Sequence, residues 1–448
     1  MKTIRSIVAA FFCSVILSVI ICSCAPETIE SPDIFDRNTE CVIDSLSEEY
    51  MMQVKAYENY TKILNIMSQQ TRSANSLDDY PDYYGGSYIN DENKLVVLIK
   101  REYLTTRDAN SIQTEVIDDV VYEPCENSYN RMIDIIVSIK NTLAFNPESL
   151  SHVSMLGIDD ASNRVFVCFS DDYTENVLNK CDFGDNIMVC YQGCHIYEES
   201  FSRVVNPGQA TFPPAPPTYP ALLCGDSIYT LVGGKAYGGS IGYRAIDSFG
   251  EEGFVTAGHN VNLSGSVYCP HTWEEIGLAV ESYYKVNNLD AAFCVVENGK
   301  FSLTNNINYT IKGNPATANW DTLSTHIVSK MLKGTIVYMS GMRSKNQQGR
   351  VISSYATYPI KVDTTDNKPY NDSIVFRDVV LSDYPSQSGD SGGIVYTKQR
   401  INNVDGTNCT VGIHVAYADS IVVDNKKIRP VVCIKAEHIN RVMGLSRY

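Results

Sequence analysis

The apolar positions in the first half of the chain follow two periods, which predict both helices and strands. Residues 41–67 and 129–145 repeat apolar side chains with the spacing of one helix face. Residues 164–169 and 186–191 are short apolar runs with β-branched and aromatic residues, and residues 171–180 between them have helical spacing. The clearest helical stripe consists of Met132, Ile135, Ile136 and Ile139. We therefore expect a small α+β region upstream.

The pattern changes after a proline-rich stretch. Residues 206–220 contain six prolines, which predicts a semi-rigid linker. Beyond it, short β-forming runs alternate with Gly, Asn and Asp turns, which favours an antiparallel barrel or sandwich. Residues 436–447 close the chain with a helical pattern. The clearest strand runs are residues 253–257, 291–296, 334–339, 349–353 and 393–396.

The charge divides at the same linker. The 448 residues include 36 Lys and Arg against 52 Asp and Glu, a formal net charge of −16. Residues 25–220 carry −19, whereas residues 221–448 carry +1. An acidic chain without clustered Lys and Arg is not expected to bind nucleic acid. We therefore predict an acidic α+β region at residues 41–205, joined by the linker to a mainly β domain at residues 221–448.

The first 24 residues have the features of an export signal rather than of folded structure. Lys2 and Arg5 precede an apolar run at residues 7–21 that is short for a membrane-spanning helix. The stretch ending at Cys24 resembles the bacterial lipoprotein signal, in which the last Cys is acylated; an ordinary cleaved secretory peptide is the alternative. Residues 25–40 are expected to be a tether. Acid directly after the cysteine resembles surface-export signals, so we expect an outer-membrane or cell-surface lipoprotein of a Gram-negative bacterium, with the downstream domain released after processing.

Three short motifs in the downstream domain supply His, Asp and Ser in that order. Residues 253–259 are an apolar strand that ends in small residues and His259, and Asp290 stands at the head of another apolar run. Ser391 lies within Ser-Gly-Asp-Ser-Gly-Gly at residues 388–393. A Ser hydroxyl becomes nucleophilic when an imidazole takes its proton, and the imidazole needs a buried carboxylate to fix its tautomer. The motifs therefore predict a catalytic triad.

The glycines around Ser391 predict a second part of the same site. They let the backbone turn so that the N–H groups of Gly389 and Ser391 point at a developing oxyanion. No metal or cofactor is expected, because the spacing of Cys190, Cys194 and His195 fits neither a haem nor a zinc motif.

The motifs together resemble the chymotrypsin-fold (trypsin-like) serine proteases, closest to the bacterial secreted branch of α-lytic protease and the streptogrisins. Residues 242–244 and 253–259 are similar to the start of that branch, and residues 340–344 with 349–351 to its mid-domain strand pair. The resemblance covers about half the chain. It implies a double six-stranded β-barrel with the triad in the cleft between the barrels. It also implies a serine endopeptidase that hydrolyses peptide or protein substrates through an acyl-enzyme.

The resemblance also suggests a specificity pocket. His414 lies where these enzymes place one pocket wall, and a His there resembles the glutamyl endopeptidases and Gln-cutting relatives. Ser388 stands at the position of a second hydroxyl donor, and Ser386 is a third candidate. We expect cutting after Glu (or Gln); the alternative is a His414 satisfied by a local carbonyl in a pocket of other preference. Tyr417 stands where relatives often have Gly, which would narrow substrate access.

Two positions depart from the family pattern. Asn260 follows the triad histidine where relatives usually have a half-cystine, so the disulfide of that loop is missing. Asp390 would be buried beside the oxyanion hole and needs a cationic partner. Arg343 is the candidate for that partner.

The upstream half is interpreted as a prosegment, because relatives of this branch resemble one another in carrying one that assists folding and inhibits the enzyme. Residues 157–167 have a faint similarity to such regions, and a permanent lipid-anchored domain is the alternative. We expect a cut between Glu198 and Ala221, with Glu198-Glu199 suited to self-cleavage. The alternative for the whole chain is a catalytically silent surface lipoprotein that uses the protease fold as a binding scaffold.

Overall fold

The computed structural model describes residues 47–448 with several gaps, and the described residues belong to one compact unit. The predicted signal peptide with Cys24, the tether, the helix at 171–180 and the proline-rich linker lie outside the described residues. The segments left out are residues 1–46, 71–79, 105–118, 145–151, 171–186, 200, 205–220, 233–234, 271–272, 287–288, 298, 309–320, 362–373 and 424–425.

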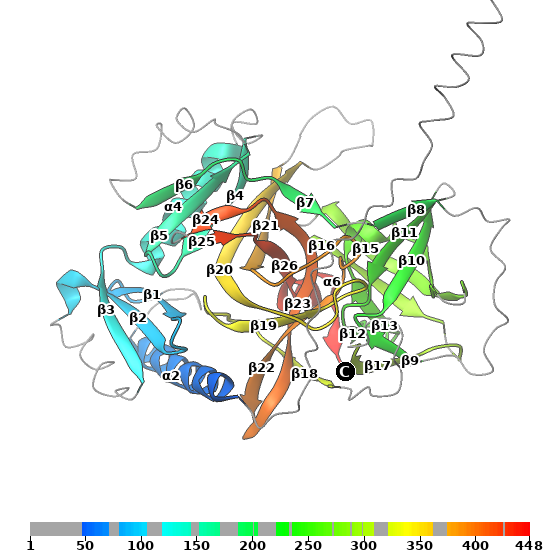
Figure 1. Ribbon diagram of the computed structural model, residues 1–448, viewed down its shortest axis with the longest axis horizontal. Coiled ribbons are helices and arrows are strands. Elements are labelled where there is room, and N and C mark those ends of the chain that lie inside the picture. Colours follow the sequence, from blue (N-terminus) through cyan, green and yellow to red (C-terminus); the bar gives the residue numbers. More distant parts are fainter. Residues whose placement is uncertain are drawn as a thin grey trace, which may run out of the picture. The chain divides into compact units, whose positions relative to one another are not determined.

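The described part of the N-terminal region contains two helices and two groups of strands (Figure 1). Helix α4 buries the predicted stripe of Met132, Ile135, Ile136 and Ile139 against the apolar strands that follow it. The periodicity therefore placed this helix correctly. The elements are α2 (Glu48–Gln70), β1 (Tyr84–Ile89), β2 (Leu95–Lys100), a 3-10 turn at Arg101–Tyr103, β3 (Val120–Cys125), α4 (Tyr129–Ala144), β4 (Val153–Asp159), β5 (Arg164–Phe169), β6 (Met188–Tyr191) and β7 (Ile196–Glu198).

A nine-stranded sheet carries the His and Asp motifs. Its strands follow the order β27-β12-β13-β16-β15-β14-β10-β11-β8. Its elements are β8 (Phe201–Val204), β10 (Ser227–Val232), β11 (Lys235–Ser240), β12 (Arg244–Ile246), β13 (Glu252–Thr256), a 3-10 turn at Gly258–Asn260, β14 (Ser266–Tyr268), β15 (Glu275–Val286), β16 (Leu289–Val296) and β27 (Ser446–Arg447). A separate parallel pair joins β9 (Ala221–Cys224) to β17 (Ser302–Ile307).

The second large sheet carries the Ser motif and closes on itself. Its strands run β19-β22-β23-β26-β21-β20, and a further pairing of β19 with β20 completes a six-stranded barrel. Strand β4 then pairs with β20 and extends this sheet through β5 and β6. Its strands from this part of the chain are β18 (Leu323–Ile327), β19 (Ile336–Ser340), β20 (Gln347–Lys361), β21 (Ile374–Ser382), β22 (Ile394–Ile401), β23 (Val404–Ala418) and β26 (Val431–Lys435). A separate pair joins β24 (Ile421–Val423) to β25 (Lys426–Ile428), and helix α6 (Ala436–Met443) follows β26.

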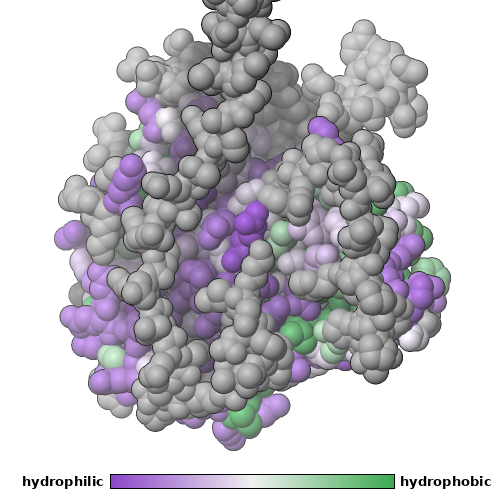
Figure 2. Space-filling view, turned by 45° about the vertical axis from the view of Figure 1, so that its right-hand side comes forward, coloured by the Kyte–Doolittle hydropathy of each residue, from purple (hydrophilic) through white to green (hydrophobic). Residues whose placement is uncertain are grey.

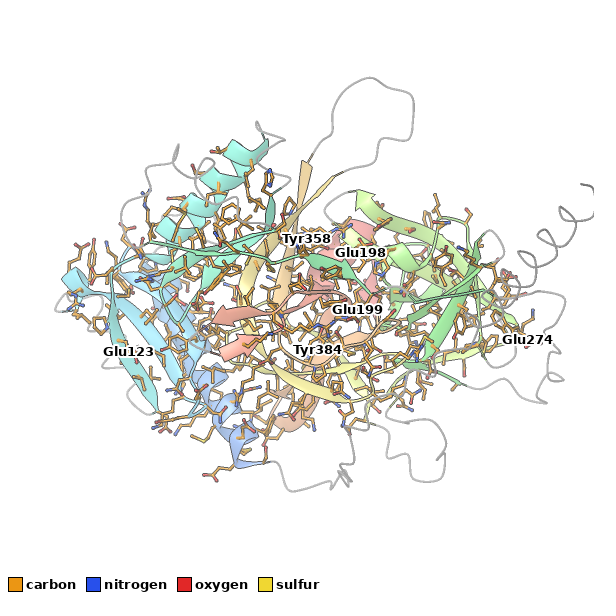
Figure 3. The ribbon with its side chains drawn as sticks, turned by 45° about the horizontal axis from the view of Figure 1, so that its top comes forward. Glu123, Glu198, Glu199, Glu274, Tyr358 and Tyr384 are labelled. Carbon is orange, nitrogen blue, oxygen red and sulfur yellow. The ribbon has the colours of Figure 1, made fainter. Side chains whose placement is uncertain are left out.

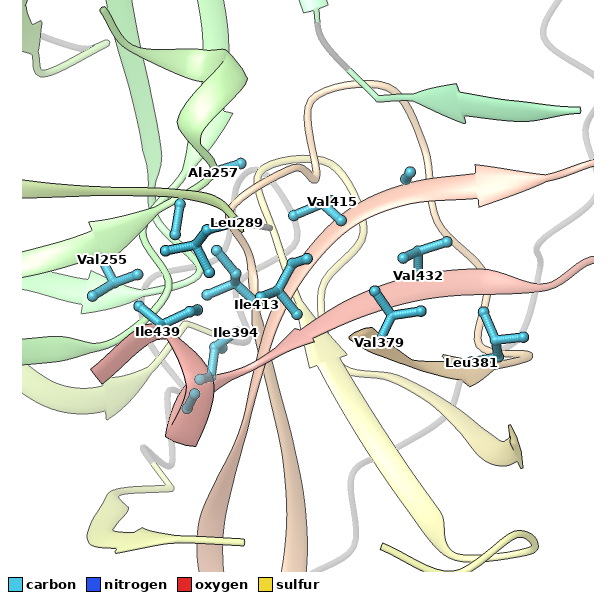
Figure 4. Close-up of a cluster of buried hydrophobic side chains, with 14 of the residues drawn as sticks. Val255, Ala257, Leu289, Val379, Leu381, Ile394, Ile413, Val415, Val432 and Ile439 are labelled. Atoms are coloured by element: carbon cyan, nitrogen blue, oxygen red, sulfur yellow. The ribbon is translucent and has the colours of Figure 1, made fainter. Parts of the chain in front are cut away.

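A shared apolar core joins the two sheets beneath the site. Figure 4 shows Val255, Ala257 and Leu289 from the first sheet facing Ile413 and Val415 from the second, with Ile439 of α6 beside them. Because these side chains are buried on both sides, the ends of β13, β16 and β23 are held in fixed relative positions. The predicted mainly β chain with a C-terminal helix and an α+β N-terminal region is confirmed.

The face of the molecule shown in Figure 2 has no large apolar patch among its described residues. On the face in Figure 2, hydrophilic residues predominate and the hydrophobic ones are scattered. No helix in the described part of the chain is long and apolar enough to cross a membrane. All nine cysteines within the described ranges are free thiols.

Candidate active site

His259 and Asp290 meet because two antiparallel strands carry them. Strand β13 pairs with β16, and Thr256 lies opposite Ala292, so the end of one strand reaches the start of the other. The Nδ1–H of His259 donates to Oδ2 of Asp290 at 2.9 Å, and its backbone N–H donates to Oδ1 at 3.0 Å. The carboxylate thus fixes both the ring and the backbone of the histidine.

The burial of this pair sets its electrostatics. Asp290 has no exposed surface, and the His259 side chain keeps 3%. Burial disfavours the carboxylate of Asp290, but His259 and then Arg377 outweigh it and lower its pKa to about 2. Burial also opposes the charged imidazole, yet Asp290 raises the pKa of His259 above its usual 6.5. An ionised Asp290 therefore favours proton uptake by His259.

Arg377 is a third charged group at the pair, which the sequence analysis did not identify. Its side chain is fully buried, and its Nη1 lies 3.3 Å from Oδ2 of Asp290 and 2.8 Å from the Tyr358 hydroxyl. Among the described residues, its Nε and Nη2 have no hydrogen-bond partner. A signal was present in the sequence, because Arg377 occupies the inward register of β21 with Val379 and Leu381.

The hydroxyl of Ser391 bonds the main chain and not His259. Its Oγ donates to the carbonyl of Val415 at 3.0 Å. Nε2 of His259 is buried and, within the described part of the chain, has no hydrogen-bond partner. A side-chain rotation of Ser391 is therefore needed to form the nucleophile–base hydrogen bond.

Backbone amides hold the loop before the nucleophile. Buried Asp390 accepts N–H bonds from Arg343 (2.7 Å), Ser344 (2.8 Å) and Gln387 (2.8 Å). Arg343 was the expected partner of Asp390, and the structure shows its backbone N–H as one of these three donors. Three N–H donors satisfy the carboxylate. Gly389 has a φ of 103°, in the region that favours glycine.

Asn260 connects the histidine turn to the nucleophile loop. Its side-chain amide donates to the backbone carbonyl of Ser391 at 2.9 Å, and its backbone carbonyl accepts from the hydroxyl of Thr230 at 2.8 Å. Asn260 is buried. A buried hydrogen bond thus stands where relatives were expected to have a disulfide.

The segment that precedes the linker occupies the site. Strand β7 pairs antiparallel with the end of β23, and Glu198 lies opposite Ala416. The N–H of Glu199 donates to the carbonyl of Val415 at 3.4 Å, and the carbonyl of Glu199 accepts from the N–H of Gly389 at 3.0 Å. The predicted oxyanion donor Gly389 therefore contacts the carbonyl of a residue in an extended, substrate-like strand.

The side chain of Glu199 is fully buried among the predicted pocket residues. The Nε2–H of His414 donates to its Oε2 at 2.9 Å, and the Ser386 hydroxyl donates to its Oε1 at 2.8 Å. Ser388 is exposed, and Ser386 makes the hydroxyl contact. A cation that the sequence analysis did not find, Arg429, lies 3.7 Å from Oε1. Figure 3 labels Glu199 close to Tyr384 near the middle of the structure.

These contacts favour an ionised carboxylate in the pocket. Burial would raise the pKa of Glu199, but the hydrogen bond and charge of His414, with Ser386 and Arg429, lower it below its usual 4.5. The hydroxyl of Tyr384 lies 3.2 Å from Nδ1 of His414 and orients the ring from behind. Burial raises the pKa of Tyr384 well above 10, so this hydroxyl keeps its proton.

One group of ligand-type residues lies within the site. Side-chain atoms of Glu198, His259 and Asp290 come within 4.8 Å of one another. Two of them already bond each other, and Glu198 accepts from the Tyr284 hydroxyl at 2.8 Å. The arrangement fits proton transfer, and we assign no metal to it.

Comparisons with known proteins give a family match in the N-terminal region. A model described as a Pro-like N-terminal domain matches residues 46–125. No curated protein matches the chain. The Pro-like domain and the two β-sheets that carry the site confirm, at the level of the fold, the resemblance to chymotrypsin-fold bacterial serine proteases.

Solved structures similar to about half of the chain include two named bacterial proteases. A Nocardiopsis protease (NAPase) is 20% identical over 51% of this chain and 100% of its own, with a TM-score of 0.36. Thermobifida fusca protease A is 18% identical over 51% and 98%, with a TM-score of 0.36. A serine protease described as glutamic acid specific, with a histidine triad in substrate binding, is 19% identical over 51% and 100%, with a TM-score of 0.36.

Proposed function

We propose that this protein is the precursor of a serine endopeptidase. Ser391 is the nucleophile, His259 the general base, Asp290 the group that orients it, and Gly389 with Ser391 the oxyanion donors. The serine-protease fold and the hydrogen-bonded His259–Asp290 pair support these roles. The hydroxyl of Ser391 attacks the carbonyl carbon while His259 takes its proton. His259 then returns that proton to the leaving amine, and water hydrolyses the acyl-enzyme.

The preferred residue before the cut bond is glutamate. The single observation that carries this proposal is the burial of Glu199, with its carboxylate on His414 and Ser386 and its carbonyl on Gly389. A site that binds a buried carboxylate through these donors discriminates against side chains that lack the charge. When such a side chain is bound, the donors of the site stay unpaired. Arg429 adds a positive charge beside the same oxygen.

The first substrate is the chain itself, at the Glu199–Ser200 bond. Glu199 is bound through its N–H, its carbonyl and its carboxylate, as a substrate residue at the cut bond would be. Until that bond is cut, β7 blocks the site for other peptides. The region before it is accordingly a prosegment that inhibits the enzyme.

A peptide-library digest with processed protein tests the specificity. Most cuts should follow Glu, with Gln a weaker second. Cutting mainly after Lys, Arg or large apolar residues would overturn the assignment of the pocket. Labelling of Ser391 by a fluorophosphonate probe separates the enzyme from a silent binding scaffold, because the scaffold would not react.

The location is proposed from the sequence. Cys24 is the acylated residue, and the precursor is held at the outer membrane or cell surface through its lipid. Metabolic labelling with a radioactive fatty acid, in wild type and Cys24→Ala, tests the anchor. Label in both proteins, or in neither, would contradict it.

A further inference from the structure

Tyr417 lies beside the docked segment at a position where a glycine was expected. It stands on β23 directly opposite Tyr197 of β7 in the strand register. Tyr197 is the residue two positions before Glu199. Because side chains of directly opposed residues project from the same face of a sheet, the two rings meet.

The two tyrosine rings stack. Their centroids are 5.2 Å apart and their planes differ by 26°. The hydroxyl of Tyr197 donates to Oδ2 of Asp419 at 3.2 Å. Offset stacking of two aromatic rings stabilises a complex by more than the burial of their apolar surface alone. A tyrosine ring can stack in this way while its hydroxyl stays hydrogen-bonded.

Arg429 connects this stack to the glutamate pocket. Its guanidinium carbon lies 3.6 Å from the centroid of the Tyr417 ring, and its Nη2 lies 3.7 Å from Oε1 of Glu199. The cation therefore contacts the aromatic ring and the bound carboxylate together. Arg429 is exposed, so the ring of Tyr417 restricts its otherwise mobile side chain.

We propose that Tyr417, with Arg429 and Asp419, forms a binding subsite for an aromatic side chain two residues before the glutamate at the cut bond. This rests on the proposed function. The substrate class is peptides of the form aromatic-X-Glu, with tyrosine preferred. All three subsite residues lie in the catalytic domain and remain with it after the cut at Glu199–Ser200. The subsite therefore serves other substrates as well as the chain's own segment.

Three fluorogenic peptides test this with the processed enzyme. Acetyl-Ile-Tyr-Glu-Glu-aminomethylcoumarin copies residues 196–199, and its matched forms carry Phe or Ala in place of Tyr. We expect kcat/KM to be about 3- to 10-fold higher for Tyr and Phe than for Ala, mostly through KM, from the usual strength of an aromatic pair. Asp419→Ala, which has no acceptor for the tyrosine hydroxyl, should remove the advantage of Tyr over Phe.

The variants assign the preference to Tyr417. In Tyr417→Gly the aromatic-to-Ala ratio should fall toward one, whereas Tyr417→Phe should keep it. A wild-type ratio within twofold, or an unchanged ratio in Tyr417→Gly, overturns the subsite and leaves the glutamate preference standing. If the wild-type enzyme cuts none of the peptides after Glu, the proposed function fails and the subsite with it.

Discussion

The proposed specificity pocket and the proposed catalytic triad differ in which of their hydrogen bonds are formed. In the pocket, both carboxylate oxygens of Glu199 are bonded and the main chain is docked on Gly389 and Val415. In the triad, the hydroxyl of Ser391 donates to Val415, and Nε2 of His259 has no partner among the described residues. The contacts that bind Glu199 are formed, whereas the hydrogen bond through which Ser391 would pass its proton to His259 is not.

Binding of the segment that blocks the site and the chemical step therefore depend on different contacts. The segment before the linker is bound by contacts that do not involve the Ser391 hydroxyl as nucleophile, so binding does not depend on catalysis. For the proposed chemistry, the Ser391 hydroxyl must leave the carbonyl of Val415 and bond His259. We therefore expect a precursor that binds its own segment tightly and then cuts it.

The largest effect should come from neutralising the bound carboxylate. Glu199→Gln removes the charge that His414, Ser386 and Arg429 face, and self-cleavage should slow by about 10- to 100-fold, the usual cost of a charge-assisted hydrogen bond in a buried site. Glu198→Gln is the matched control. Glu198 is exposed, bonds Tyr284 and raises the pKa of His259. At a pH above that pKa, where His259 is neutral in both proteins, loss of the Glu198 charge should change the rate by less than about 3-fold. The fraction of cut chain against time measures both, and equal slowing in the two variants would contradict the pocket assignment.

Self-cleavage should depend on pH through His259. The pKa of His259 is raised above its usual 6.5, and the base works when it is neutral. The rate should therefore fall about tenfold per unit as the pH drops below that raised pKa. Chain produced unfolded and refolded at each pH, then sampled by mass spectrometry, gives the profile. A rate that is flat, or that rises on acidification through this range, would argue against His259 as the base.

Arg377 should affect the pH at which the self-cleavage rate falls, which we call the acid limb of the pH–rate profile. Its positive charge lowers the pKa of His259. In Arg377→Met the limb should therefore shift to higher pH by a fraction of a unit to about one unit, since the Asp290–His259 pair loses an opposing cation. Arg377→Lys keeps the charge and should shift it less. A purely structural role would reduce the rate at every pH without moving the limb.

The smallest effect is on stability, measured where no cutting occurs. In the Ser391→Ala background, Glu199→Gln should lower the free energy of unfolding by about 1 to 3 kcal/mol. The folded-state pKa of Glu199 lies below 4.5, so the ionised carboxylate stabilises the folded chain fully above pH 4.5. Below pH 4.5 that contribution is lost, and the two unfolding curves should converge. A difference that grows on acidification would contradict the bound, ionised Glu199.

Local sequence patterns predicted the helices and strands in which apolar residues repeat along one buried face. Strand β5 matches residues 164–169 in full, and α4 differs from 129–145 by one residue, because in each a run of apolar positions is buried along its whole length. Strand β20 was predicted only at 349–353, although it extends over Gln347–Lys361. Its far part pairs with β4, some 200 residues earlier in the chain. Such pairing leaves no local signal.

The same limit applies to the site. Motif spacing predicted His259, Asp290 and Ser391 as the triad, and resemblance suggested His414, because each stands in a short recognisable run. Tyr384 and Arg429 reach the pocket from other strands and loops, and only the folded chain brings them to His414 and Glu199. The Glu198-Glu199 pair was predicted as a cutting site from residue type, but which glutamate is bound depends on the register of β7.

If the chain cuts itself after Glu199, intact-mass analysis of the purified precursor should show the cut. Wild-type protein should yield a fragment that ends at Glu199 and one that begins at Ser200, whereas Ser391→Ala should remain whole. Identical fragments from both proteins, or a wild-type cut at another bond, would contradict the account.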